Sequence, residues 1–286
     1  MKIKDIKEKY NAIDGSMYGE KNINNHLGLL YHENSKLTRL TSIQQGRKIG
    51  GFNNAYVTER SVQPYKMYPG KTIVKLDNSE DPPVNNDFSS ILKNRRSGRE
   101  YDKDYKISLN ELSHILYNSY GVSYKEKILN FDLNGHVGFR NLPSAGGLYP
   151  LEIYVVMLNG HISSGLYHYR PDINSLEIIS ERDYTEKMAD LITAEPYVQI
   201  RNASCIVLIT AVVERSIIKY GERGYRFILQ ESGVVGTGIG LIAESLQLSS
   251  CWIGGYLDEE LEDFLGIDGV FESINNVLTI GKNKKI

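Results

Sequence analysis

The segment "SCIVLITAVV", residues 204–213, constrains the fold of this chain more than any other stretch. It is a continuous apolar run, largely β-branched, that shows neither helical periodicity nor alternation with polar residues. Such a run is typical of a strand that is buried on both faces. A pattern of helical length, "YRFILQESGVVGTGIGLIAESLQL", follows at residues 225–248 and predicts a long helix. The chain is therefore expected to combine a buried sheet with helices packed against it.

The remaining patterns predict an α+β fold. "SLNELSHILYNSYG" indicates a helix that begins with a capping box of Ser108 and Glu111 and stops at Gly121. "LEIYVVMLNGHI" predicts a strand that ends in the hairpin signal Asn159-Gly160. We expect further strands at 165–180 (with a turn inside), 251–254 and 275–282, and further helices at 183–193 and 258–266, the last capped by Asp258. Hairpins followed by β–α alternation are typical of helices packed on a mixed central sheet.

Length and composition set the wider limits. A chain of 286 residues can bury one large core or two modest ones. The acidic, proline-containing stretch 76–87 has the composition of a linker, which predicts an N-terminal segment 1–87 and a main domain 88–286. A formal net charge of −2 gives no reason to expect nucleic acid or an anionic membrane as a partner.

Two further features predict a cytoplasmic protein. The N-terminus is too charged for a signal peptide, and no apolar run reaches the roughly 18 residues of a membrane span. Cys205 and Cys251 lie far apart in apolar segments. We expect buried, reduced thiols there, and neither a disulfide framework nor a metal site.

The stretch "NRRSGREYD" gathers positive charge at residues 94–102. Its three guanidiniums, with the Ser97 hydroxyl between them, suit a phosphate dianion, because arginine forms charge-assisted bidentate hydrogen bonds. Gly98 would let the backbone approach such a ligand. The alternative is a solvated basic face that follows a helix. The arginines concerned are Arg95, Arg96 and Arg99.

Two glycine-containing turns could present bare backbone to a ligand. The turn Pro143-Ser144-Ala145-Gly146-Gly147 has no bulky side chain, so its N–H and C=O groups could meet the edge of a planar ligand. Gly254-Gly255 follows the strand "CWI" and could donate amides in the same way. In both places the alternative is a tight connection without a ligand.

Two more features admit both a functional and a structural interpretation. Lys219-Tyr220 lies in a polar, loop-like insert and could be an acid–base pair, although most such dipeptides are surface residues. The helix at 225–248 carries four glycines, each of which costs about 1 kcal/mol relative to alanine. Close packing must compensate, and we favour a subunit interface over direct contact with a cofactor. The four are Gly233, Gly236, Gly238 and Gly240.

Taken in order, these segments resemble the nitroreductase superfamily. "RRSGREY", "PSAGGLYPLEIYVV", "GLYHY", "KYGERGYRF", "SSCWIGGY" and "TIGK" are most similar to its SagB-type branch of FMN-dependent azoline dehydrogenases. The resemblance covers residues 88–286 and implies an intertwined homodimer with two FMN sites at its interface.

The resemblance also implies roles for single residues. The FMN phosphate and ribityl chain would be bound by Arg95, Arg96, Ser97, Arg99 and Lys282. The turn 143–147 of the other protomer would lie along the isoalloxazine. Gly254 and Gly255 would face the flavin heteroatoms. Gln199 falls near a position that meets the flavin in related proteins. Lys219 and Tyr220 match the catalytic acid–base pair of that branch.

The implied reaction is the oxidation of thiazolines or oxazolines in a ribosomally made peptide to thiazoles or oxazoles, with the reduced flavin reoxidised by O₂. A separate cyclodehydratase would supply the azoline, and the segment 1–87 could dock to it or to the precursor peptide. Two alternatives stay open. One is a generic NAD(P)H-dependent nitro- or quinone reductase, and the other is a flavin-binding structural subunit of a peptide-modifying complex.

Overall fold

The computed structural model describes residues 27–54, 57, 65–76, 82–127 and 136–284. The chain divides into two compact units, Met1–Lys48 and Ile49–Ile286. In the first unit the described residues form helix α3, Leu27–Asn34, and most of helix α4, Arg39–Gly50. Large apolar side chains of this unit are exposed: Leu27, Leu30, Leu37, Leu40 and Ile43.

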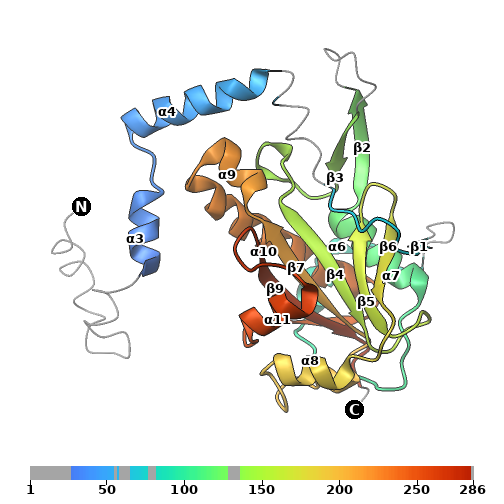
Figure 1. The fold of residues 1–286 in the computed structure, drawn as a ribbon. Helices are drawn as coiled ribbons and strands as arrows, with labels where there is room; N and C mark the ends of the chain where they lie inside the picture. The colour runs from blue at the N-terminus through green and yellow to red at the C-terminus, as the bar shows by residue number, and fades with distance from the viewer. Residues whose placement is uncertain (1–26, 55–56, 58–64, 77–81, 128–135, 285–286) are drawn as a thin grey trace. The chain divides into compact units, whose positions relative to one another are not determined.

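A seven-stranded sheet forms the centre of the second unit (Figure 1). Its order is β1-β6-β5-β4-β7-β9-β8. The strands are β1 (Ile73–Lys75), β4 (Leu151–Met157), β5 (Gly165–Arg170), β6 (Ser175–Ser180), β7 (Cys205–Val212), β8 (Ser249–Ile253) and β9 (Glu272–Gly281). A separate hairpin pairs β2 (Val122–Lys127) with β3 (His136–Arg140). The first strand of the sheet thus comes from within the segment 1–87.

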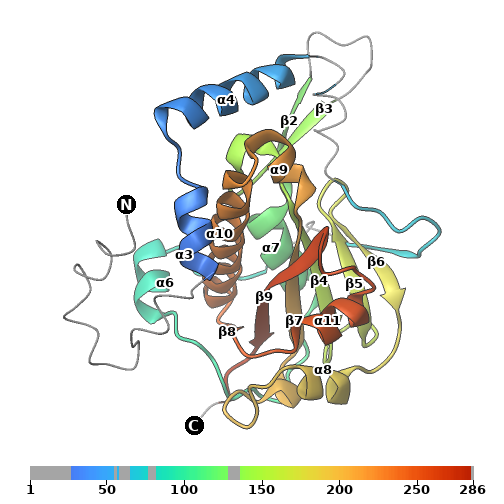
Figure 2. The ribbon, with the colours of Figure 1, turned by 60° about the vertical axis from the view of Figure 1, so that its left-hand side comes forward.

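Helices cover both faces of this sheet (Figures 1 and 2). They are α6 (Phe88–Asn94), α7 (Leu109–Tyr120), α8 (Thr185–Leu191), α9 (Glu214–Tyr220), α10 (Arg223–Ser245) and α11 (Asp258–Leu265). Strand β4 shows the two layers directly, because Leu151 and Ile153 belong to the core under α7 and α10. Tyr154 and Val156 belong to the core under α8 and α11. Burial of β4 on both faces explains why its sequence is apolar throughout.

The α+β class and the flanking helices are confirmed. One detail differs, since all pairings between neighbouring strands of the large sheet are antiparallel. Among the described residues, parallel pairing is limited to isolated bridges such as Ser97–Ser250. The capping box of Ser108 and Glu111 is present, and α7 ends at Gly121 as predicted. Helix α11 is capped by Leu257 and not by Asp258, which is its first residue.

The hairpin β4–β5 forms, but Asn159-Gly160 is not a two-residue turn. The strands are joined through residues 158–164, because other parts of the chain hold this loop. The amides of Leu158 and Asn159 donate to the Ser204 carbonyl at 3.0 and 2.8 Å. The Asn159 side chain donates to the Lys103 carbonyl at 2.8 Å. A local turn signal was thus overridden by tertiary contacts.

Several predicted absences concern the described part of the chain only. Cys205 and Cys251 are free thiols and both are buried, as predicted. None of the described helices is long and apolar enough to span a membrane. The described residues also hold no group of three or more His, Cys, Asp or Glu side chains suited to a metal ion.

Candidate functional site

The turn 143–147 and the Lys219–Tyr220 pair lie against each other. Gly146 and Gly147 have φ values of 65° and 67°, a region that favours glycine. A Cβ added to Gly146 would overlap the Tyr220 hydroxyl and lie 3.0 Å from the Lys219 Nζ. A side chain at this point would therefore displace the Tyr220 hydroxyl, and an amine and a phenol flank the bare backbone.

Lys219 and Tyr220 belong to the last turn of α9, so the expected loop at this position was wrong. The Tyr220 ring packs edge-on against Phe227, with ring centroids 5.0 Å apart. The Lys219 Nζ lies 5.3 Å from the centre of the Phe52 ring. Burial raises the pKa of the Tyr220 phenol, so that group stays protonated at neutral pH. An amine beside a protonated phenol can serve in proton transfer.

The loop that carries this turn is fixed by its own hydrogen bonds. The Tyr149 amide donates to the Ser144 hydroxyl at 2.9 Å, and the Gly147 amide donates to the Ser144 carbonyl at 3.1 Å. Tyr149 adopts a φ of 45°, which a non-glycine residue rarely does. Its hydroxyl accepts the Arg140 amide at 2.9 Å. These contacts close residues 140–149 into one unit.

The turn rests on a carboxyl group that the sequence analysis missed. Glu231, on α10, is 5% exposed, and the Tyr120 hydroxyl donates to it at 3.1 Å. Burial raises the pKa of Glu231 to about 7, against the opposing effects of the Ser144 and Tyr120 hydroxyls and of Arg140. The sequence did contain a signal for Glu231, because this charged residue lies on the apolar stripe of a predicted helix.

The predicted phosphate-binding segment is held at the end of the sheet. Arg95 caps α6, and Ser97 forms a parallel bridge with Ser250 of β8. The Gly98 amide donates to the Ser250 carbonyl at 3.0 Å. A Cβ on Gly98 would overlap Ser249, so the close approach of this loop to β8 requires glycine. The Arg96 guanidinium donates to the carbonyls of Lys93, in the last turn of α6, and of Arg95, each at 2.8 Å.

Three other residues predicted to bind the cofactor lie beside the arginine segment or at the end of β8. The backbone amide of Gln199 donates to the Arg99 carbonyl at 2.8 Å. The Asp102 amide donates to the Lys282 carbonyl at 2.8 Å, which brings the end of β9 to the arginine segment. Gly254 follows β8, and a Cβ there would meet nothing within 4 Å. Its backbone is therefore open to a ligand.

Gly255 is placed differently, because part of its backbone is already used. Its carbonyl accepts the Thr193 amide at 2.9 Å. A Cβ at this position would lie 2.8 Å from the Thr193 hydroxyl. Gly255, the second residue after the strand, thus ties the end of β8 to the end of α8. Its own amide is left as the group that could face a ligand.

The glycines of α10 show how the two groups of residues are arranged. A Cβ on Gly238 would lie 2.7 Å from Leu142, beside the turn, and one on Gly240 would lie 3.1 Å from the Ser250 hydroxyl, beside the arginine segment. Residues two apart on a helix point about 200° apart. The turn and the arginines of one chain therefore lie on opposite sides of α10.

The sequence analysis favoured a subunit interface as the reason for the four glycines of α10. A Cβ on Gly236 would overlap the Trp252 ring, so close packing within the chain explains Gly236, Gly238 and Gly240. A Cβ on Gly233 would meet nothing within 4 Å of the described residues. Only at this fourth position does the structure leave room for another subunit or a ligand.

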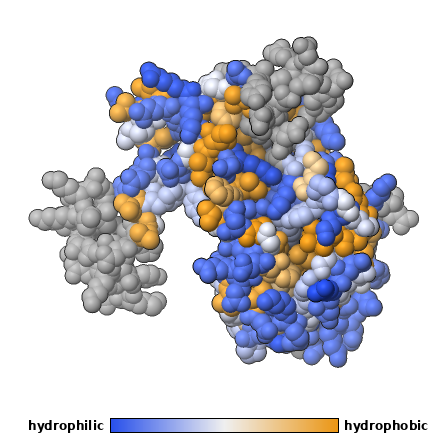
Figure 3. Space-filling model, in the orientation of Figure 1, coloured by the Kyte–Doolittle hydropathy of each residue, from blue (hydrophilic) through white to orange (hydrophobic). Residues whose placement is uncertain are grey.

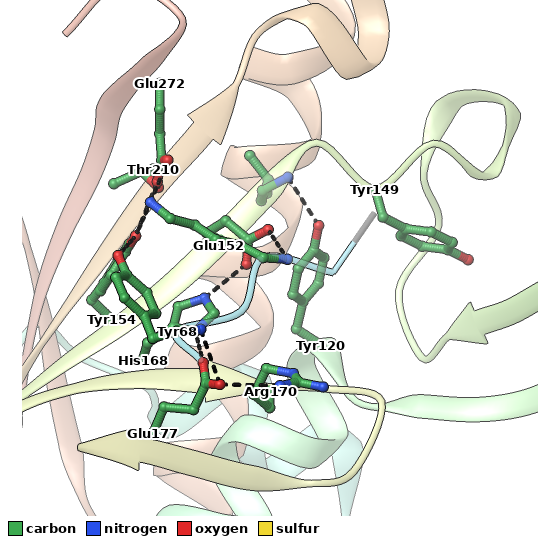
Figure 4. Close-up of polar contacts among 12 residues, drawn as sticks. Tyr68, Tyr120, Tyr149, Glu152, Tyr154, His168, Arg170, Glu177, Thr210 and Glu272 are labelled. Atoms are coloured by element: carbon green, nitrogen blue, oxygen red, sulfur yellow. Dashed lines mark hydrogen bonds and ion pairs between the residues drawn. The ribbon is translucent and has the colours of Figure 1, made fainter. Parts of the chain in front are cut away.

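A buried ionic network lies on the other face of the sheet (Figure 4). His168 is fully buried, and its two ring nitrogens lie 2.9 Å from carboxylate oxygens of Glu152 and Glu177. Burial lowers the pKa of His168, but these two hydrogen bonds outweigh it and raise the pKa. Arg215, in the first turn of α9, pairs with Glu152 at 2.6 Å. The network therefore anchors the helix that carries Lys219.

The family profile described as "Nitroreductase family" matches residues 92–282. The chain belongs to the nitroreductase family. It is accordingly an oxidoreductase of that family.

Two curated proteins are similar to the chain. A candidate nitroreductase of Methanocaldococcus jannaschii, MJ1384, is 34% identical over 181 residues, which cover 63% of this chain and 84% of that protein. The microcin B17-processing protein McbC of Escherichia coli is 25% identical over 134 residues, or 45% of this chain and 49% of McbC. The stronger likeness is to MJ1384, and the likeness to McbC is distant.

Solved structures agree with the family. A candidate nitroreductase of Anabaena variabilis is 27% identical with a TM-score of 0.68, and the match covers 88% of this chain but 45% of that one. The chain thus spans less than half the length of that structure. The Escherichia coli McbBCD microcin synthetase complex, solved with truncated pro-MccB17, matches with a TM-score of 0.56 at 18% identity, over 87% of this chain and 99% of that one. This last likeness concerns the fold alone.

Proposed function

We propose that the protein is an FMN-dependent azoline dehydrogenase that converts thiazolines or oxazolines of a peptide into thiazoles or oxazoles. The observation that carries the proposal is the contact of Lys219 and Tyr220 with the bare turn at Gly146. A generic flavin reductase that takes hydride from a nicotinamide has no evident need for an amine and a protonated phenol at this position. Oxidation of an azoline to an azole does require a base, because a ring proton must be removed.

The residues present fit FMN. Arg95, Arg96 and Arg99 stand within one short loop beside Lys282, and this set suits a phosphate dianion. The open backbone at Gly254 and the turn at 143–147 suit the flat faces and edges of a ring system. Bound FMN would supply the two-electron acceptor that the oxidation needs.

The chain's own residues would manage the proton. We assign Lys219 as the base that takes the ring Cα proton of the azoline, and Tyr220 as the group that orients the substrate or passes the proton on. The raised pKa of Tyr220 keeps a hydroxyl available as a donor at neutral pH. Gly146 is necessary because any side chain there would displace the Tyr220 hydroxyl.

A homodimer would complete the site. Since the turn and the arginines of one chain lie on opposite sides of α10, one ligand of FMN size would reach both only if a second copy supplied one of them. Apolar side chains are exposed on α9 and α10, namely Ile218, Tyr225, Leu229 and Val234. Figure 3 shows apolar surface gathered on this face, in the region where α9 lies in Figure 1. Burial of this surface would drive the association.

The N-terminal segment 1–87 is proposed to dock to a partner cyclodehydratase or to the precursor peptide. The exposed apolar side chains of α3 and α4 support this role, because burying such side chains against a partner is favourable. The matched structure is that of a multi-protein complex, the Escherichia coli microcin synthetase McbBCD, with truncated pro-MccB17 bound. A docking role would leave the cyclodehydratase activity itself to another protein.

The test is a single-turnover, anaerobic mixture of the flavin-loaded protein with an azoline-containing peptide. Bleaching of the visible flavin absorbance together with loss of two hydrogens from the peptide, both absent in Lys219→Ala, would support the proposal. The rival is a nitro- or quinone reductase, which the 34% identity to MJ1384 favours. Rapid bleaching by NAD(P)H, with the peptide unchanged and Lys219→Ala fully active, would establish that rival. A flavin-free protein that a cyclodehydratase nevertheless requires would indicate a structural subunit.

A further inference from the structure

The guanidinium of Arg215 joins the two halves of the candidate site. Arg215 lies in the first turn of α9, and Lys219 follows it four residues later on the same helix. Its Nη1 pairs with a carboxylate oxygen of Glu152 at 2.6 Å and donates to the Tyr149 carbonyl at 3.3 Å. Tyr149 belongs to the hydrogen-bonded loop that also holds Gly146. One side chain therefore links the helix that carries Lys219 to the loop that carries the bare turn.

Helix α9 needs such an anchor, because its own sequence gives it little stability. It has seven residues, fewer than an isolated helix needs to be stable in water. No described side chain caps its N-terminus, and Ser216 is the one buried residue among the seven. Ile218 is 53% exposed. The position of α9 is therefore set by tertiary contacts, and the ion pair of Arg215 is one that reaches the central sheet.

The acceptor of this ion pair is itself firmly held. Glu152 lies on the central strand β4 and is 2% exposed. Its Oε1 also accepts the Lys66 amide at 3.3 Å, and its Oε2 lies 2.9 Å from Nε2 of the buried His168 (Figure 4). Burial raises the pKa of Glu152, but the Arg215 guanidinium and the hydrogen bond to His168 outweigh it and lower the pKa to about 2. A fixed and ionised acceptor can orient the guanidinium that it binds.

A second arginine belongs to the same network but comes from the sheet. Arg170 of β5 pairs with Glu177 at 3.0 Å and with Asp172 at 2.6 Å. Glu177 in turn bonds the other ring nitrogen of His168. The side chains of Arg170 and Arg215 are shielded to a similar extent, at 10% and 16% exposed. Loss of either guanidinium would leave a buried carboxylate without one of its partners. The two arginines differ in that Arg215 belongs to the helix of the candidate site.

We propose that Arg215 is a positioning residue that fixes the distance between Lys219 and the turn at Gly146. Its ion pair with Glu152 anchors α9 to the sheet, and its hydrogen bond to the Tyr149 carbonyl ties the loop to the same guanidinium. Removal of the guanidinium should free both the helix and the loop. The effect on azoline oxidation rests on the proposed function, whereas the effect on α9 and the loop does not.

Hydrogen–deuterium exchange tests the effect on α9 and the loop, with the full-length protein and no substrate. The matched variants are Arg215→Gln and Arg170→Gln. In Arg215→Gln the amides of residues 147–149 and 217–221 should exchange about 10-fold faster relative to those of β7, because a hydrogen bond between charged groups is lost. In Arg170→Gln the same amides should exchange as in the unmodified protein. Equal acceleration in both variants, or none in Arg215→Gln, would overturn the inference.

The kinetics of azoline oxidation give a second readout. A misplaced Lys219 should slow the reaction without weakening the binding of the peptide. We therefore expect Arg215→Gln to lower kcat about 10- to 100-fold with the KM for the peptide unchanged. Arg170→Gln should keep the kcat of the unmodified protein. An equal loss of kcat in both variants, as a merely structural role would cause, or an unchanged kcat in Arg215→Gln would overturn the inference.

If Arg215→Gln fails to fold, Arg215→Lys is measured in its place, with Arg170→Lys as the control. Lysine keeps the positive charge, but its shorter side chain ends in a single nitrogen and lacks the planar fork. The same amides should exchange faster in Arg215→Lys, and unchanged exchange would overturn the inference. Faster exchange without azoline oxidation by any form of the protein would refute the proposed function and keep the inference. Azoline oxidation at equal rates in all forms, with unchanged exchange, would do the reverse.

Discussion

Replacement of Gly146 by alanine should damage the site in a way that can be separated from its effect on stability. The left-handed φ of 65° costs an L-residue about 1–2 kcal/mol. For a unit of this size, that cost corresponds to a fall in Tm of about 2–8 °C. In addition, the new methyl group would overlap the Tyr220 hydroxyl, which must retreat by about 1 Å to reach van der Waals contact.

A displacement of that size in a catalytic group typically costs about 100-fold in rate. Gly266→Ala is the matched control, because Gly266, after α11, has a nearly identical φ of 69°. Its Cβ would meet nothing within 4 Å. Both variants should therefore show the same loss of Tm in thermal unfolding, and only Gly146→Ala should lose about 100-fold in the rate of azoline oxidation. Equal rates in the two variants would refute the argument that Gly146 is kept for the sake of Tyr220.

Four further perturbations have defined outcomes. Gly233→Ala should stabilise the protein by about 1 kcal/mol in urea unfolding, because alanine favours the helix and meets no neighbour. Gly236→Ala should instead destabilise it, since its methyl group would overlap the Trp252 ring. The raised pKa of His168 stabilises the folded protein, and this contribution is complete below the unfolded-state pKa of about 6.5. The contribution should be lost as the pH rises through the folded-state pKa of His168, which the free energy of unfolding measured at increasing pH would show. Arg99→Ala should weaken FMN binding about 10- to 100-fold in a flavin-fluorescence titration, because a charge-assisted hydrogen bond to phosphate is removed.

Each of these perturbations has an outcome that would contradict it. Equal effects of alanine at positions 233 and 236 would show that the Trp252 contact does not limit α10. A free energy of unfolding that is flat across the rise in pH would mean that His168 keeps no extra proton in the folded state. Unchanged flavin affinity in Arg99→Ala would separate the arginine segment from the cofactor.

Local signals in the sequence were sufficient for most elements. The capping box at Ser108 fixes the start of α7 because both of its partners lie within one helical turn. The apolar run at 204–213 identified β7 because no polar face interrupts it. The Asn159-Gly160 signal failed because Ser204 and Lys103, distant in sequence, hold that loop more firmly than its own turn preference does.

The sequence by itself determined the kinds of element, their order and, through the resemblance carried by its motifs, the family. Only the tertiary structure placed Lys219 and Tyr220 on a helix against Gly146, because their neighbourhood depends on backbone more than 70 residues away in the sequence. It alone showed that Glu231 and Arg140 are buried behind the turn. Whether a charged residue is solvated or buried is decided by the packing of several elements at once. That packing shifts its pKa and defines its role, and no local pattern encodes it.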